Sequence, residues 1–551
     1  MHILDFVTII IFALGIICAG LAFSRRSKNI KSFFFAGGAA PWAMSGLSLF
    51  MGFFSAGTFI VWGSIAYLYG WVAVTIQWTM AMAGLLVGLL IAPRWNRTRS
   101  LTVADYITKR LGKRTQQIYT YLFLFVSLFT SGAFLYPVAK IIEVSTGLPL
   151  NLSIIILGLF CILYTSLGGL WAVMSTDVLQ FVILMSAVII VLPMSIDHIG
   201  GWDSFVTLLP KTAEDFVNEE FSWVFMIAFA LYNTIFLGGN WAYVQRYTSV
   251  KGEKNARYVA FLFCGLYLLC SVLWMLPPML YRDVDPGLGI RESEGAFLLM
   301  CKTVLPAGLL GLMLGGMIFA TASSFNAVLN ITSGVITNDI YRRFNHNASE
   351  KKLMTVARLS TLTIGLLTIV VAMLIPLMGG IVNVVISIAA LTGVPLYLPV
   401  IWTLFSKFQT SFSVVFSTIF SLTVNLVLKF MLPLTALGSL SRASEMAVGV
   451  SVPFFCMLAF EVYFRIKGQK VADHSFPADK KASGTETVEV EESETRDDNR
   501  FSRRVVGYGI GTTGLIIMLL GFTADFGRMI ICGVAALLLL SGGLIVVLSR
   551  K

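Results

Sequence analysis

The chain has 551 residues, of which 57% are hydrophobic and 13% charged, whereas soluble domains are usually about 45–50% apolar and about 25% charged. This balance excludes an ordinary soluble enzyme and indicates that lipid is the solvent for much of the chain. The net charge of +11 does not call for nucleic acid as a partner, because membrane proteins collect Lys and Arg in their cytoplasmic loops and no basic stripe interleaved with aromatics lies outside such loops.

Apolar runs recur along the whole sequence. About 20 helical residues span a hydrocarbon core, and about fifteen spanning segments are expected, at 4–23, 41–69, 71–93, 117–142, 150–167, 177–196, 222–246, 256–281, 305–336, 354–378, 381–405, 411–432, 445–466, 504–523 and 527–549. The first is interpreted as a spanning helix and not as a signal peptide, because no basic region precedes it and Arg25 and Arg26 follow it. The expected fold class is an all-α integral membrane protein.

The loops between these segments alternate in charge. Lys and Arg concentrate in loops 24–40, 94–116, 246–257 and 340–353, whereas loops 197–221 and 282–297 are acidic or neutral. By the positive-inside rule, the basic loops are predicted to be cytoplasmic and the N-terminus to lie outside. The expected location is the plasma (inner) membrane, crossed many times.

Two stretches are not expected to span the membrane. The sequence SLTVADYITKRLG (100–112) predicts an amphipathic helix on the cytoplasmic surface. Residues 467–503 carry an acidic run with no apolar period and are predicted to be a disordered cytoplasmic linker. The sequence contains no Walker A motif, which argues against an ATP-driven pump.

Glycines interrupt two expected helices that lie five segments apart. Gly52 and Gly57 interrupt the second, and Gly238 and Gly239, followed by Asn240, interrupt the seventh. Secondary transporters place their sites at such interruptions in corresponding positions of two halves, and a spacing of five inverts the second half. Close helix packing is the alternative role of these glycines. The predicted organisation is a helix and loop (1–36), a first inverted repeat (37–196), a loop (197–221), a second repeat (222–408), additional helices (409–466), the acidic linker (467–503) and two C-terminal helices (504–551).

Polar residues inside two segments are candidates for a cation site. The ninth segment carries Thr321, Ser323 and Ser324 close together, and oxygen-rich faces suit hard cations. The alternative is that these hydroxyls bond their own helix or a neighbouring one. Asp177, at the expected start of the sixth segment, is a functional candidate because acids within the membrane are costly. Its alternative role is a first-turn carboxylate that stabilises the helix dipole.

Five stretches between about 30 and 405 together carry a family resemblance: SFFFAGGAAPWAMSGLSLFMGFFSAGTFI (32–60), LTVADYITKRLG (101–112), YTSLGGLWAVMSTDVLQFVI (164–183), GGNWAYVQRYTSVKGEKNAR (238–257) and MIFATASSFNAVLNITSGVITNDIYRR (317–343). In these stretches, which occur in family order, the sequence resembles the sodium/solute symporter family, which includes sodium–glucose, sodium–proline, sodium–sialate and sodium–iodide symporters. The resemblance implies the inverted-repeat fold of the bacterial leucine transporter. It also implies a secondary active transporter, not an enzyme, which imports a small polar organic solute by symport with sodium through alternating access. A proton-coupled or facilitated transporter on the same fold is the alternative; a channel or a membrane sensor is less favoured, because no filter loop or signalling domain is visible.

The resemblance further implies a sodium site, with sodium as the cofactor and solute, sodium and lipid bilayer as the partners, and with no nucleic acid and no obligatory protein partner. Carried over by position, the sodium ligands are the carbonyls of Met51, Phe54 and Ala320 and the hydroxyls of Ser323 and Ser324, with Asp177 close to the site.

The solute site is expected to differ from that of the family's sugar transporters. The positions that bind sugar there correspond to Thr58, Gln77, Met80, Asn233, Tyr267 and Ala389, of which only Asn233 matches. Phe236 stands where those transporters have Tyr, so galactose or glucose in the same pose is not expected. The solute is instead expected to be held by neutral hydrogen bonds, with no Lys or Arg at the core of its site, in a cavity lined by Thr58, Gln77, Asn233, Phe236 and Asn240.

Overall fold

The computed structural model describes residues 2–24, 40–100, 102–165, 170–208, 215–345, 349–378, 380–434, 440–468 and 485–549. Within these ranges the chain is helical throughout, and its one β-type feature is an isolated bridge between Ala40 and Val250. The expected all-α fold class is confirmed. The elements used below are α1 (Ile3–Ser24), α3 (Trp42–Met51), η2 (Thr58–Trp62), α4 (Gly63–Tyr69), α5 (Val72–Leu86), η3 (Val87–Ile91), α6 (Ala92–Arg97), α7 (Val103–Leu111), α8 (Lys113–Thr146), α9 (Leu150–Thr165), α10 (Leu170–His198), α11 (Trp202–Leu208), α12 (Trp223–Gly239), α13 (Trp241–Thr248), α14 (Glu253–Val284), η5 (Ser293–Gly295), α15 (Ala296–Val304), α16 (Leu309–Val335), η6 (Ile336–Tyr341), α17 (Arg342–Phe344), α18 (Glu350–Leu374), α19 (Ile381–Ile388), η8 (Ala389–Gly393), α20 (Val394–Trp402), α21 (Ser411–Phe430), α22 (Arg442–Ile466), α23 (Thr485–Thr523) and α24 (Arg528–Leu548).

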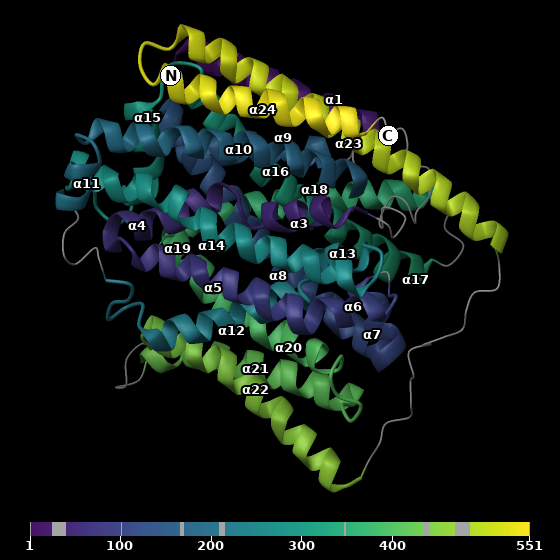
Figure 1. Ribbon diagram of the computed structural model, residues 1–551. Coiled ribbons are helices and arrows are strands. Elements are labelled where there is room, and N and C mark those ends of the chain that lie inside the picture. The colour runs from purple at the N-terminus through teal and green to yellow at the C-terminus, as the bar shows by residue number, and fades with distance from the viewer. Residues whose placement is uncertain are drawn as a thin grey trace.

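Ten helices in the described ranges are long and apolar enough to cross a membrane, and the bent pair formed by α12 and α13 meets the same test when it is counted as one span. Shorter apolar helices, among them Trp42–Met51, Thr58–Tyr69 and Leu309–Thr321, add to these. The chain is therefore a multi-pass membrane protein. Most of its helices run in roughly one direction, so that their ends gather at two opposite faces (Figure 1).

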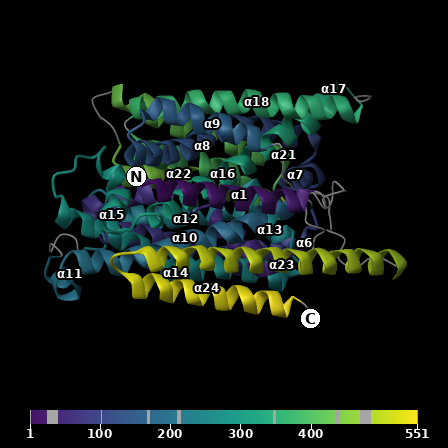
Figure 2. The same ribbon diagram turned by 90° about the horizontal axis from the view of Figure 1, so that it is seen from above.

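The two faces are distinguished by the elements that end there. One face carries α4, α11 and α15 together with the N-terminus, and the other carries α6, α7, α13 and the C-terminus (Figure 1). The view from above also places the two termini at opposite ends of the bundle, and shows α23 projecting beyond its neighbours (Figure 2). Helices α23 and α24 form an outer layer, where Leu537, Leu540 and Leu544 are exposed as lipid-facing side chains should be.

The second expected helix is broken in the middle. α3 ends at Met51 and helical structure resumes at Ala56, so the chain from Gly52 to Ser55 lies outside any helix. Irregular backbone at membrane depth must find hydrogen-bond partners within the protein. Thr58 supplies one, since its hydroxyl donates to the Phe53 carbonyl at 2.9 Å and accepts from the Ser55 amide at 3.3 Å.

The seventh expected helix is broken as well. α12 and α13 meet at Asn240 with a bend of 62°. Asn240 serves as the N-cap of α13, because its side-chain oxygen accepts from the Ala242 amide at 3.0 Å. Both glycine-rich interruptions in the sequence thus coincide with interruptions of the helices.

Of three further expectations, the helix at 100–112 is present, whereas the start of the sixth segment and the linker at 467–503 differ from what was expected. The surface helix expected at 100–112 is present as α7, with Thr102 as its N-cap. The sixth segment, expected at 177–196, is longer: α10 begins at Leu170, so Asp177 lies two turns inside the helix and does not cap it.

The disordered linker expected at 467–503 is helical from Thr485 onward. Its Glu and Arg residues favour helix, and this helical stretch is continuous with the apolar part of α23. Residues 469–484 of that linker lie outside the described ranges.

Helix α1 is hydrogen-bonded to the start of α16 through the side chain of Asp5. The carboxylate of Asp5, buried in this contact, accepts from the amides of Gly308 at 2.7 Å and Gly311 at 3.1 Å. A carboxylate at a helix N-terminus satisfies unpaired amides and interacts favourably with the helix dipole. Gly311 is required here, because a Cβ would come within 2.2 Å of the Asp5 carbonyl oxygen. The sequence offered no sign of this role for Asp5.

Candidate functional site

Two adjoining cavities lie beside the break between α3 and η2. The larger has a volume of about 160 Å³ and the smaller about 60 Å³. They share five lining residues: Gly52, Thr130, Phe134, Phe236 and Tyr243. The break itself therefore forms part of the wall of both cavities.

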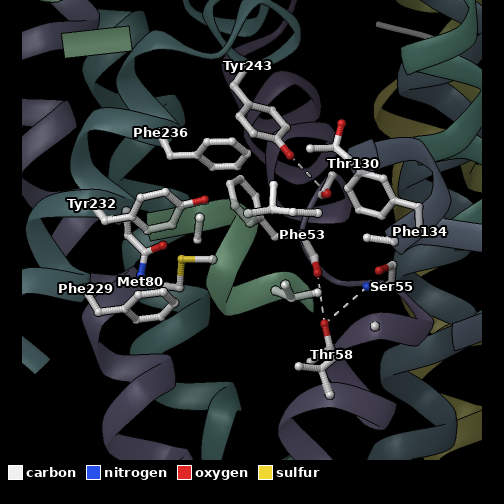
Figure 3. Close-up of a pocket in the computed structure, with 18 of the residues that line it drawn as sticks. Phe53, Ser55, Thr58, Met80, Thr130, Phe134, Phe229, Tyr232, Phe236 and Tyr243 are labelled. Carbon is white, nitrogen blue, oxygen red and sulfur yellow. Dashed lines mark hydrogen bonds between the residues drawn. The ribbon is translucent and has the colours of Figure 1, made fainter. Parts of the chain in front are cut away.

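Aromatic rings dominate the larger cavity. Along α12, the rings of Phe229, Tyr232 and Phe236 follow one another at helical spacing, and each neighbouring pair stacks with centroids 5.5 Å apart. The Phe236 ring meets Phe53 and Tyr243 edge-on, at 5.9 and 5.7 Å. Figure 3 shows these rings lining one side of the cavity, with Phe134 opposite and Thr58 at its base. Offset and edge-on pairs are the favoured aromatic geometries, so this wall is held by its own packing.

Asn233 presents a fixed hydrogen-bond acceptor to the larger cavity. Its Nδ2 donates to Thr79 Oγ1 at 2.9 Å, and the Thr79 hydroxyl donates in turn to the Ile76 carbonyl at 2.6 Å. Because the Thr79 proton is already committed, the Asn233 amide can only point its NH₂ group at Thr79. Its Oδ1 accepts no hydrogen bond from the described part of the chain, and Asn233 lines the cavity.

A polar chain lines the smaller cavity. Ser48 Oγ on α3 donates to Asp177 Oδ2 on α10 at 2.5 Å, and Arg246 Nε on α13 donates to Ser48 Oγ at 2.9 Å. All three side chains are buried. Buried charges are tolerated when opposite charges and hydrogen bonds compensate them, and Ser48 joins the two here.

The residues expected to bind sodium surround the same break. Ser324 Oγ on α16 lies 3.3 Å from the Met51 carbonyl and 3.4 Å from the carbonyl of Ala320. Phe54 lies within the break, with its ring buried against Phe50 and Trp274. Ser324 also lines the smaller cavity, together with Asp177. Ser323 is on α16, but its side chain lies outside the described part of the structure.

The residues expected to bind solute are divided between the cavities. Thr58, Asn233 and Phe236 line the larger one, and Asn240 lines the smaller one beside Phe236. Gln77 lines neither of the two; it is buried on α5, and Met80, three residues further on, faces the larger cavity in its place. Tyr267 and Ala389, also aligned with sugar-binding positions, line the larger cavity as well.

Arg246 is a site residue that the sequence reasoning missed. It was counted among the cations of a cytoplasmic loop, yet it is buried on α13 and lines the smaller cavity. The available signal was its spacing from Tyr243, since residues three apart share a helix face. Tyr243 lines both cavities, so Arg246 lies on the site-facing side of α13.

Comparison with known proteins identifies the family to which this chain belongs. The model of the sodium:solute symporter family matches residues 33–415. The chain belongs to this family. Because the family consists of sodium-coupled transporters, this member is a transporter and not an enzyme, and sodium is its coupling ion and not a cofactor in the usual sense.

Two sodium/glucose cotransporters are among the relatives of this symporter family member. The sodium/glucose cotransporter of Vibrio parahaemolyticus is 28% identical over 476 residues, which cover 78% of this chain and 86% of that protein. Sodium/glucose cotransporter 1 of Oryctolagus cuniculus is 27% identical over 403 residues, 64% of this chain and 61% of that protein. A solved structure of a substrate-bound, outward-open Na⁺-coupled sialic acid symporter matches with a TM-score of 0.69 at 21% identity, over 84% of this chain and 98% of that chain. This match shows a shared fold.

Proposed function

We propose that the protein imports a small organic solute by symport with sodium, through alternating access. The observation that carries this proposal is the meeting of the broken helix with α16, where the Ser324 hydroxyl lies 3.3 Å from the Met51 carbonyl. Unwound backbone that lines a cavity frees carbonyl oxygens for a cation, as in other secondary transporters. Membership of a family of sodium-coupled transporters also supports symport with sodium.

The sodium site that we propose uses oxygens from two helices. The carbonyls of Met51 and Phe54 belong to the break, and the carbonyl of Ala320 and the hydroxyls of Ser323 and Ser324 belong to α16. These neutral oxygens suit a hard cation. Asp177 would favour the bound cation through space, while its link to Ser48 holds it beside the broken helix.

The remaining parts of the proposal concern organisation and orientation. We infer about fifteen spans, two inverted repeats over 37–196 and 222–408, and the further divisions expected from the sequence. The breaks in α3–η2 and α12–α13, at corresponding positions of the two repeats, support this arrangement. We place the protein in the plasma (inner) membrane, and the Lys/Arg-rich loops support an orientation with the N-terminus outside.

Thermal unfolding of the purified full-length protein tests the sodium site without knowledge of the solute. A ligand that binds only the folded state stabilises it by about 2.7 kcal/mol at 100 times its Kd. Sodium chloride is expected to raise the unfolding temperature above that in equimolar potassium chloride. Ser324→Ala should require about tenfold more sodium for the same effect, a loss of about 1.4 kcal/mol.

The matched control is Ser451→Ala, since Ser451 lies on α22 and its hydroxyl bonds its own helix at the Val448 carbonyl. Its sodium response should match that of the wild type. Equal stabilisation by sodium and potassium would remove the sodium assignment and favour proton coupling or facilitated transport. An unchanged response in Ser324→Ala would remove Ser324 from the proposed sodium site.

A further inference from the structure

The described wall of the larger cavity offers no charge to its occupant. None of the described residues that line it is acidic or basic, and Asp177 and Arg246 line the smaller cavity. Moving an ionised group from water into such a site costs many kcal/mol unless a partner compensates it. An occupant of the larger cavity is therefore expected to be uncharged.

The threonine hydroxyls in the cavity wall already donate within the protein. Thr58 bonds the Phe53 carbonyl, Thr130 bonds the Val126 and Ser127 carbonyls, and Thr392 bonds the Ile388 carbonyl. A sugar carries a hydroxyl on almost every carbon, and each would need a partner in place of water. The protons of these threonines are not available to a sugar, so a compound with few polar groups fits this part of the wall better than a polyol does.

Two polar groups on α12 remain available. Asn233 Oδ1 is an acceptor whose orientation is fixed by Thr79, and it needs a donor from the occupant. The Tyr232 hydroxyl, which donates to no described residue, also faces the cavity (Figure 3). The Tyr232 ring is held in place against Gly393, where a Cβ would come within 2.2 Å of Tyr232 Cε2. The occupant should therefore carry one donor and one acceptor.

The remaining wall favours a flat ring. The Phe53 and Phe236 rings meet edge-on at 5.9 Å and line the cavity with Tyr243 and Phe229. An added ring gains the same offset or edge-on contacts. The volume of about 160 Å³ is close to that of an apolar cavity of about 150 Å³ that holds benzene.

Resting on the proposed function, we infer that the transported solute is an uncharged, planar ring compound of about six to ten non-hydrogen atoms that carries an N–H donor and a carbonyl acceptor. The N–H group donates to Asn233 Oδ1, the carbonyl accepts from the Tyr232 hydroxyl, and the ring lies against Phe236. Pyrimidine bases and aromatic carboxamides have this chemistry.

The test measures thermal stabilisation of the full-length protein in saturating sodium by four probes: nicotinamide, uracil, benzoate and glucose. Nicotinamide or uracil should stabilise the protein, and benzoate and glucose should not. Stabilisation by benzoate alone would indicate an anionic solute that reaches Arg246, and stabilisation by glucose alone would indicate a polyol. If sodium stabilises the protein but neither ring probe does, the solute class is wrong while the sodium-coupled function stands.

Two variants locate the bound probe. Tyr232→Phe removes only a hydroxyl and should weaken binding about tenfold, and Asn233→Leu should weaken it at least as much, with sodium stabilisation retained in both. Tyr258→Phe and Asn255→Leu, on α14 and lining neither cavity, are the matched controls and should bind as the wild type does. Unchanged probe affinity in both Tyr232→Phe and Asn233→Leu would overturn the assignment.

Discussion

At the scale of single residues, the site depends on groups whose neighbours fix their state. The Ser48 hydroxyl on α3 accepts a hydrogen bond from the Arg246 guanidinium and donates one to the Asp177 carboxylate. It therefore links two buried charged side chains from different helices. The hydroxyl of Thr79 orients Asn233 in a comparable way. Neither relation follows from residue type alone, because the partners are more than 100 positions apart.

The role of Asp177 can be separated from its structural contribution. Asp177→Asn should raise the sodium concentration for half-maximal stabilisation, because it removes an anion near the cation. It should also lower the unfolding temperature, because Arg246 loses its compensating charge. The double variant Asp177→Asn with Arg246→Gln should recover stability but not sodium affinity. Recovery of both, or a normal sodium response in Asp177→Asn, would show that Asp177 acts on the fold alone.

At the scale of elements, the two glycine-rich breaks were predictable because glycine acts locally on the helix that contains it. The rotation of α5, which buries Gln77 and turns Met80 to the larger cavity, was not predictable, because packing against other helices sets it. α10 begins at Leu170 and not at the expected residue 177, because the residue type of Asp177 does not distinguish a first-turn acid from an acid inside a helix. The meeting of Ser324 with Met51 joins residues 273 positions apart, and only the family resemblance anticipated it.

Gly52 and Gly57, at the first break, differ in how much space surrounds them. A Cβ on Gly52 would lie 2.9 Å from Tyr243 Cε1, whereas the nearest atom to a Cβ on Gly57 is Ser55 Oγ at 3.5 Å. Gly52→Ala should therefore displace the Tyr243 ring and weaken solute binding roughly tenfold or more, while Gly57→Ala should bind nearly normally. Uptake assays over a range of solute concentrations measure both. Equal effects of the two substitutions would show that flexibility, and not the space beside Tyr243, is what the break requires.

At the scale of the whole molecule, orientation is the first prediction. α14 runs between the two faces; Lys254, in its first turn, and Arg291, beyond its end, are both exposed. In a cysteine-free background, Lys254→Cys should react with an impermeant maleimide only from the cytoplasm and Arg291→Cys only from outside. Reaction of both from the same side would contradict the assigned topology.

A buried acid joins elements at the face that carries the N-terminus. Glu294, in η5, accepts from the Tyr136 hydroxyl of α8 at 3.2 Å and from the Ile381 amide of α19 at 3.4 Å. Burial raises the pKa of its carboxyl above the usual range, and Lys140 and these hydrogen bonds offset part of that effect. A raised folded-state pKa contributes stability at pH below the unfolded value, and this contribution is lost as pH rises through the folded value.

Wild-type protein should therefore lose stability relative to Glu294→Gln as pH rises from about 4 toward neutrality. Unfolding temperatures of both proteins across this range are the measurement. Glu292→Gln is the control, because Glu292 is an exposed neighbour. Parallel profiles for wild type and Glu294→Gln would show that the Glu294 carboxyl is not perturbed.

The central claim is sodium-coupled symport, and accumulation in proteoliposomes tests it most directly. Uptake of labelled uncharged ring compounds, sugars, carboxylates and amino acids would be compared under an inward sodium gradient, an inward proton gradient and no gradient. At least one solute should accumulate above its external concentration under the sodium gradient alone, and Ser324→Ala should shift that dependence to about tenfold higher sodium. Accumulation driven by protons without sodium, or equilibration without accumulation under every gradient, would contradict the account.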